Sequence, residues 1–334
     1  METDFESHVV DAPPAAEPQE HRTISGFWRR SLAFVLDGIL IGLVGLALGL
    51  VLFDFLAQLG GWGRLVGFGV ALAYFGLLNS SAGDGQTLGK RIMKIAVVDR
   101  NGNCISPGRS FVRYTVLAAP FFLNGAMLSP SIVISPIGFL IGLVVFGLGG
   151  ATLYLYIFNR ATRQSVHDLV VGTFVVKTCS QGKVCPRPVW KPNLVIAGVW
   201  VFLVVAALCV HPQFVGGETL RQLLTAQESI QATGKVHTAS VSVKTVWALA
   251  GGRKGTYVES VAVWKERPHA YGAAARQVAA IILKEYPGVM DKDGLVITIA
   301  YGYDIGIAHY WQRRWFAHRP QQWRQILAKA PAAN

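Results

Sequence analysis

An arginine and an aspartate lie close together in a stretch of sequence that is otherwise almost entirely apolar. The stretch FWRRSLAFVLDGILIGLVGLALGLVLF begins at Phe27 and holds Arg30 near its start and Asp37 about two helical turns later. A charge inside a membrane helix costs about 2.5–3.5 kcal/mol on insertion scales, so an intramembrane acid is a candidate functional group. The chemistry it suggests is the binding of a cation or a proton. The alternative is a charge pair that holds helices together.

The spacing places Arg30 and Asp37 on nearly the same face of a helix, because residues seven apart are two turns apart. Their Cα atoms would lie about 10 Å apart along the axis, so contact requires the arginine side chain to extend inward. A transport pathway would also need polar groups through the bilayer, and few interrupt the apolar positions: Asn79, Asn124 and scattered serines. The sequence therefore favours the charge pair, and the cation or proton site remains the alternative.

The elements that position these charges are membrane helices. Hydrophobic residues form 52% of the 334-residue chain and charged residues only 15%, well below the charged fraction of a typical soluble domain. A spanning helix needs about 20 mostly apolar residues. Five segments qualify, the third being the weakest because it contains Pro120 and Asn124: 31–54, 61–79, 113–130, 133–158 and 194–211. In the first helix, Gly45 and Gly49 form a small-residue face that predicts close helix packing.

Lysine and arginine positions predict the orientation. Basic residues cluster before the first predicted helix and in the loops after the second and fourth, and are sparse in the loops between. The positive-inside rule then places the N-terminus and these two loops in the cytoplasm and delivers residues 212–334 outside. Residues 1–24, polar and proline-containing, are expected to be a disordered cytoplasmic tail, and no signal peptide is predicted. Residues 179–193 form the expected cytoplasmic linker.

The two basic loops carry local structure. GQTLGKRIMKI has apolar Leu88, Ile92 and Ile95, which predicts a short amphipathic helix whose basic residues, Lys90 among them, face lipid headgroups. AVVDRNGNCIS alternates around an Asn-Gly turn and predicts a hairpin. In the second loop, SVHDLVV predicts a helical turn or two. TFVVK predicts a strand that joins the hairpin in a small sheet beneath the membrane.

These loops resemble the RDD family of bacterial membrane proteins. The matching blocks are RRSLAFVLD, GQTLGKRIMKIAVVD with the NG, IS and GRS positions after it, and RQSVHDLVVGTFVV, together about residues 25–178. The family is named for one arginine and two aspartates, which here match Arg30, Asp37 and Asp168. The same blocks mark Gln86, Gly89, Lys90 and His167 as motif positions. His167 is interpreted as a helix-cap or interface residue.

The resemblance implies a helical membrane bundle with a charge cluster, and a function in the transport of unidentified ligands, ion- or proton-coupled in some members. We expect Arg30 to bridge Asp37 and Asp168 near the cytoplasmic side, because a shared guanidinium keeps both carboxylates charged. The alternative function is a non-transporting anchor or scaffold whose outside domain binds an envelope partner or anionic lipid. The expected localisation is the bacterial inner membrane.

Residues 212–334 are predicted to form an α+β domain with helix and strand patterns in the order α-β-β-α-β-β-α. This order predicts a four-stranded antiparallel sheet covered by helices on one face. The domain holds 15 lysines and arginines against eight acids, and HYWQRRWFAHRPQQWR mixes these cations with aromatic residues. Such a surface is suited to anionic lipid headgroups. Asp304 in YGYDIG is interpreted as a turn residue.

The sequence points away from catalysis and metal binding. It shows no nucleophile–base pair, and Cys179 and Cys185 have no ligand cluster beside them for zinc. No enzymatic activity, cofactor or metal is expected. The expected partners are the lipid bilayer, anionic lipid headgroups and a second copy of the chain; nucleic acid is not expected, given the predicted outside location of the basic domain.

Overall fold

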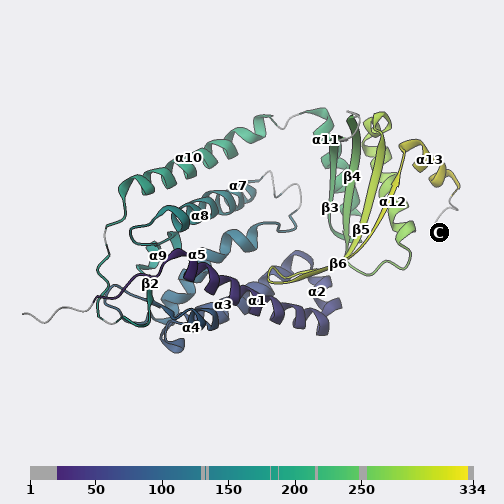
Figure 1. Ribbon diagram of the computed structural model, residues 1–334. Helices are drawn as coiled ribbons and strands as arrows, with labels where there is room; N and C mark the ends of the chain where they lie inside the picture. Colours follow the sequence, from purple (N-terminus) through teal and green to yellow (C-terminus); the bar gives the residue numbers. More distant parts are fainter. Residues whose placement is uncertain are drawn as a thin grey trace, which may run out of the picture.

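The computed structural model describes residues 21–128, 132, 135–180, 182–186, 188–214, 217–247 and 254–329. It contains a helical bundle with a small sheet at one end and a larger α+β domain at the other (Figure 1). We call the end that carries the small sheet the loop end, and the end that carries the larger sheet the sheet end. Most of the predicted tail, residues 1–20, and the centre of the predicted GGRKG turn, residues 251–253, lie outside the described residues.

Four helical segments of the described chain are long and apolar enough to cross a membrane: Phe27–Val51, Phe53–Leu78, Pro136–Phe158 and Lys191–Val210. They agree with four of the five predicted spans. Large apolar side chains are exposed along them, as expected for helices that contact lipid. The bundle helices are α1 (Phe27–Val51), α2 (Phe53–Leu59), η1 (Gly60–Trp62), α3 (Gly63–Leu78), α5 (Pro107–Leu123), α7 (Pro136–Gly142), η3 (Leu143–Leu148), α8 (Gly149–Phe158) and α10 (Lys191–Phe214).

The predicted third span, 113–130, is replaced by α5, which begins six residues earlier. Ser106 caps its N-terminus by accepting a hydrogen bond from the Arg109 amide, and Pro107 occupies the first turn. The helix ends before Gly125, whose φ of 76° favours glycine. With 17 residues it measures about 26 Å. It packs along α3, and it brings the buried side chain of Arg113 into the bundle.

The fourth predicted span is one helix with a π-helical centre. In η3 the backbone widens, and the carbonyl oxygen of Phe146 accepts a hydrogen bond of 2.9 Å from the indole nitrogen of Trp200 on α10. Gly150 lies directly against this indole ring, where a β-carbon would not fit. The π segment is thus explained by the packing of α10 on α8.

The small sheet at the loop end pairs β1 (Ile95–Val98) with β2 (Phe174–Lys177) in antiparallel register. This confirms the predicted pairing of the two loops. The predicted Asn-Gly hairpin is only half correct, because the turn at 99–103 leads into α5 and not into a second strand. The sheet is flanked by η2 (Ser81–Gly83), α4 (Leu88–Ile92) and α9 (Val166–Val171).

Residues at the boundary of the predicted tail belong to this subdomain. His21 and Ile24 form β-bridges to Lys183 and Val176, so residues 21–24 are not a free tail. The predicted amphipathic helix is shortened to α4: Leu88 and Ile92 are exposed, whereas Ile95 is completely buried in β1. The backbone pairing of β1 thus overrides the helical periodicity of GQTLGKRIMKI.

The C-terminal domain has the predicted order of elements, with a sheet order of β3-β4-β5-β6. The predicted all-antiparallel sheet is wrong at its centre, where β4 and β5 pair in parallel. The reason is that α12 crosses over between them and brings β5 back in the same direction. The elements are α11 (Glu218–Ala232), β3 (Val236–Trp247), β4 (Lys254–Trp264), α12 (Tyr271–Glu285), η4 (Pro287–Asp291), β5 (Gly294–Asp304), β6 (His309–His318) and α13 (Pro320–Lys329).

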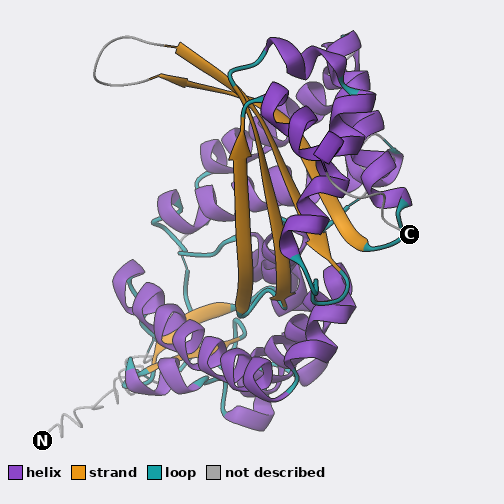
Figure 2. Cartoon of the chain, turned by 90° about the vertical axis from the view of Figure 1, so that its right-hand side faces the viewer, coloured by secondary structure: helices purple, strands orange, loops and turns teal. Residues whose placement is uncertain are grey.

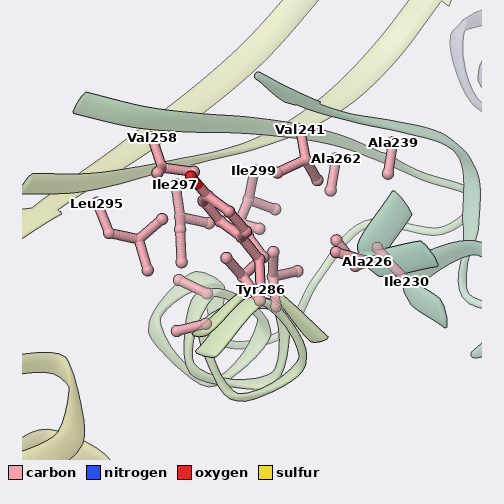
Figure 3. Close-up of a cluster of buried hydrophobic side chains, with 14 of the residues drawn as sticks. Ala226, Ile230, Ala239, Val241, Val258, Ala262, Tyr286, Leu295, Ile297 and Ile299 are labelled. Carbon is pink, nitrogen blue, oxygen red and sulfur yellow. The ribbon is translucent and has the colours of Figure 1, made fainter. Parts of the chain in front are cut away.

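One face of this sheet forms the domain core (Figures 2 and 3). Ile297 and Ile299 of β5 are fully buried and pack with Tyr286, at the end of α12, and with Ile230 of α11. Trp323 of α13 closes the cluster and donates a hydrogen bond of 3.0 Å to the carbonyl oxygen of Leu295. Helices α11, α12 and α13, together with the short helix η4, contribute the helical members of this cluster, in agreement with the prediction that helices cover one face.

The β5–β6 hairpin extends from the sheet into the bundle, between α1, α2 and α3 (Figure 1). Its tip, residues 305–308, packs beside Gly45 of α1 and Gly67 of α3. A β-carbon on Gly67 would overlap the carbonyl oxygen of Ile305, and one on Gly45 would lie 2.8 Å from the β-carbon of Ala308. The glycine face of the first helix therefore accommodates a strand hairpin. The prediction that this face packs against another helix is therefore wrong.

Ion pairing fastens the hairpin. Arg64 of α3 donates hydrogen bonds of 3.2 and 2.6 Å from Nε and Nη2 to Asp304, whose other oxygen accepts the Gly306 amide at 2.8 Å. The Tyr301 hydroxyl donates a 2.8 Å hydrogen bond to Asp54. Asp304 thus holds the turn, as predicted, and also joins the hairpin to the bundle.

We expect the loop end and the sheet end to react on opposite sides of a membrane. In a protein in which serine replaces the other three native cysteines, exposed Cys104 at the loop end should resist an impermeant maleimide in intact cells. A cysteine-free protein with Thr225→Cys, at an exposed position of α11, should react. Labelling of Cys104 in intact cells but not of the residue-225 cysteine would contradict this orientation.

Candidate functional site

Asp168 is the centre of a buried ion cluster at the loop end. It is completely buried and comes directly after His167 in α9. Arg30 Nη2 lies 2.9 Å from one carboxylate oxygen, and Arg113 donates from Nε and Nη2 to the other at 2.9 and 2.6 Å. Thr173 Oγ1 donates to the same oxygen as Arg113 at 3.1 Å. One carboxylate therefore pairs with two guanidinium groups from α1 and α5.

The electrostatics of the cluster keep Asp168 charged. Burial raises its pKa, but Arg113 and Arg30 outweigh burial and hold the pKa of the carboxyl well below its usual range. His167 responds in the opposite sense: burial lowers its pKa to about 3, so its ring is neutral at physiological pH. The cluster of Arg30, Arg113 and Asp168 thus carries a net charge of +1, on side chains that are each more than nine-tenths buried.

Asp37 belongs to a separate network. Its carboxylate accepts hydrogen bonds from the Tyr74 hydroxyl at 2.7 Å, the Thr87 hydroxyl at 2.5 Å and the Gly89 amide at 2.8 Å. Among the described residues, Arg30 forms no hydrogen bond or ion pair with Asp37. The predicted bridge through Arg30 is therefore wrong for Asp37 and correct for Asp168. Neutral hydrogen-bond donors surround the Asp37 carboxylate, and the Arg30 side chain does not extend along α1 to reach it.

The residues of the loop motif around Gly89 are explained by their contacts with Asp37 and with the elements beside it. Gly89 must be glycine because a β-carbon there would overlap the carbonyl oxygen of Ala33 in α1. Its amide can then reach Asp37, which fastens α4 to α1. Gln86 donates a 2.9 Å hydrogen bond to the carbonyl oxygen of Ile95, which fixes the loop to β1. Asp37 is thus a structural anchor for the loop, and the Thr87 hydroxyl that caps α4 also bonds to it.

Lys90 is directed into the bundle and not toward lipid headgroups, contrary to the sequence-based expectation. Its Nζ donates a 2.6 Å hydrogen bond to Asn79 Oδ1 at the end of α3. Burial, together with the charge of Arg113, lowers its pKa to about 7. Lys90 is therefore a titratable group at physiological pH, placed beside two permanent cations.

A cavity of about 640 Å³ opens beside these groups. Its polar lining includes Arg30, Lys90 and Arg113, and no aspartate or glutamate of the described chain lines it. Its apolar lining comes from α1, α3, α5, η3 and α8, and from the two strands of the small sheet, β1 and β2. A second cavity of about 260 Å³ shares lining residues with it and ends at Gly306 and Ile307 of the hairpin tip. Its shared lining residues are Phe34, Phe75, Tyr114, Leu117 and Phe121.

Sequence reasoning missed Arg113, Asn79 and Tyr74 as members of these networks. The signal for Arg113 is a second arginine at the border of a weak predicted span, where a buried cation requires a partner. No sequence pattern indicates that Tyr74 would face Asp37, because that contact depends on how α3 rotates against α1. Within the described part of the chain, no three His, Cys, Asp or Glu side chains gather to hold a metal ion.

The two networks should be energetically separate. Asp168→Asn leaves two buried arginines without a counter-charge and should cost about 3–5 kcal/mol of stability. Arg30→Met combined with Asp168→Asn should deviate from additivity by about 0.5–3 kcal/mol, whereas Arg30→Met with Asp37→Asn should be additive within about 0.5 kcal/mol. Unfolding in detergent measures both pairs. Strong coupling between Arg30 and Asp37 would refute the separation.

Lys90 should make stability depend on pH. The pKa of Lys90 is lowered in the folded protein. Between about pH 7 and the usual pKa of lysine, the unfolded chain therefore binds one more proton than the folded protein does. Stability contributed by this group therefore rises with pH across that interval. Melting temperatures of the wild type and Lys90→Met, compared from pH 6 to pH 9, should diverge above about pH 7 in favour of the wild type. Parallel curves would show that Lys90 does not titrate in this interval.

The comparison with known protein families agrees with this geometry. A model of the RDD family matches residues 24–172, which include Arg30, Asp37, Asp168 and the whole loop motif. No curated protein and no solved structure matches the chain. The matched range covers α1 through α9 and stops before β2 and α10, so the α+β domain lies outside it. Residues 24–172 match the RDD family, and the chain has in addition a further membrane helix and an α+β domain.

Proposed function

We propose that this protein has a role in transport, with its substrate site in the cavity beside Arg30, Lys90 and Arg113. The supporting observation is the shared lining of the two cavities, from the cationic groups at the loop end to the hairpin tip. In this proposal the loop end is open and the hairpin closes the sheet end. Opening and closing at opposite ends of a central site is the general logic of transporters.

The charge arrangement argues for an anionic substrate. Asp168 already pairs with two arginines, and Asp37 already accepts three hydrogen bonds, so neither carboxylate is available for a metal cation. A proton can still be involved, because the pKa of Lys90 is lowered to about 7 by burial. Proton coupling through Lys90 is thus part of the proposal. The proposal includes no enzymatic step.

The proposed location is the bacterial inner membrane, with the loop end in the cytoplasm and the sheet end outside. The basic loops support this orientation, because they coincide with the loop end. The hairpin then connects an outside domain to the substrate site. That connection gives the outside domain a regulatory role in the proposal, since displacement of the hairpin would open the path.

A second candidate function is an anchor or scaffold that does not transport. The observation in its favour is β6, an edge strand of the four-stranded sheet. It exposes Trp315, which is 73% accessible, beside the exposed Arg313 and Arg314. Such a surface suits an envelope partner or anionic lipid headgroups, and a firmly docked hairpin would then only hold the outside domain in place.

Substitution of Gly67 separates the two functions. Gly67→Leu should displace the hairpin because its side chain would overlap Ile305, whereas Gly69→Leu on the same helix has open space and serves as the matched control. In proteoliposomes, the probes are an internal pH dye, which reports proton flux, and fluorescent phosphatidylglycerol, which is an anionic lipid. We expect flux of at least one probe in the wild type, and faster flux in Gly67→Leu only. No flux of either probe in any of these proteins would favour the anchor.

A further inference from the structure

The polar end of the larger cavity has an excess of positive charge. Arg30 and Arg113 share one counter-ion, Asp168, and Lys90 bonds only to the neutral Asn79 among the described residues. Asp37, the other acid nearby, does not line the cavity. An anion placed here would meet three cationic side chains from three elements, α1, α4 and α5. A small cation would be repelled.

Two buried polar atoms beside these cations have no hydrogen-bond partner. They are Nδ1 of His167, a residue only 4% exposed, and Oγ1 of Thr152 in α8. Both residues line the cavity. Buried polar groups in proteins are nearly always hydrogen-bonded, so these two unpartnered atoms mark a polar region of the protein directly beside the cavity.

Beyond the polar end, the cavity is apolar and open toward the sides of the bundle. Phe34 on α1, Phe121 on α5 and Leu153 on α8 line it and are each more than half exposed. From Arg113 to Phe121, α5 provides a wall about 12 Å long. In a membrane these exposed side chains face lipid, so the cavity opens to the hydrocarbon layer. Its cations lie near the loop-end termini of the membrane helices, with Arg30 in the first turn of α1 and Lys90 after the end of α3.

We infer that this cavity binds one anionic phospholipid from the surrounding leaflet. The phosphate lies among Arg30, Lys90 and Arg113, and an acyl chain lies along the apolar wall of α5 and α8. The inference deepens the proposed function, on which it rests for the use of the bound lipid, by naming the substrate class. Basic pockets between membrane helices are suited to lipid phosphates. A free phosphate would leave the apolar part of the cavity without an occupant.

Lipid retention in native mass spectrometry tests the inference on the full chain in detergent, without any flux measurement. Phosphatidylglycerol should be retained as a single adduct at about tenfold lower concentration than phosphatidylcholine. Lys90→Gln should weaken phosphatidylglycerol retention about fivefold and leave phosphatidylcholine unchanged. Arg91→Gln removes the same charge from the neighbouring, exposed position of α4 and should have little effect.

A second pair of variants tests the apolar part of the site. Leu117→Trp fills the cavity and should abolish the adduct, whereas Leu43→Trp, on the lipid-exposed surface of α1, should not. Equal retention of the two lipids, equal losses in Lys90→Gln and Arg91→Gln, or a retained adduct in a folded Leu117→Trp protein would each overturn the inference. Displacement of the lipid by excess inorganic phosphate would overturn it in favour of a free-anion site. Specific retention without flux would reject transport and leave the lipid site intact.

Discussion

The fold of the bundle depends on one buried carboxylate shared by two arginines. Asp168 is completely buried, and Arg30 and Arg113 reach it from helices that are far apart in the sequence. Charges taken out of water are tolerated only when paired and hydrogen-bonded, and this pairing joins α1, α5 and α9 at the loop end. The remaining excess charge is positive and lies at the polar end of the adjoining cavity.

The second acid of the family motif acts by a different physical principle. Asp37 has no cation bonded to it within the described chain; hydroxyl and amide donors surround it instead. The Asp37 carboxylate therefore organises the loop, because its two oxygens accept the hydrogen bonds that hold the start of α4 against α1. Lys90 is directed toward the bundle as a consequence. The structural role of Asp37 and the ligand-binding role proposed for Lys90 are thus connected through one short helix.

At the opposite end, glycines in α1 and α3 admit a β-hairpin where helices would otherwise close on each other. Gly45 and Gly67 provide the space, and the ion pair of Arg64 with Asp304 fixes the hairpin turn. The C-terminal domain and the bundle are therefore one mechanical unit and not two domains joined by a linker. Any movement of the sheet relative to α3 must either break this ion pair or move the bundle with it.

The sequence alone determined the features that arise from local pattern and from the surrounding solvent. Long apolar runs predicted four of the spans, and period-two alternation predicted the strands of the C-terminal domain. Motif blocks identified Arg30, Asp37 and Asp168 as residues of interest. Such features depend on each residue and its close neighbours in the chain. The beginning of α5 at Ser106 and Pro107 was equally local, but the apolar content downstream obscured it.

Only the tertiary structure decided which charges meet. Whether Arg30 pairs with Asp37 or Asp168 depends on the rotation and depth of α1 against α5 and α9, and spacing along one helix does not contain that information. The parallel pairing of β4 with β5, the inward direction of Lys90 and the docking of the hairpin on the glycines are long-range contacts of the same kind. Each is selected by the packing of distant segments, because the free energy of burying a charge or an apolar surface depends on what covers it.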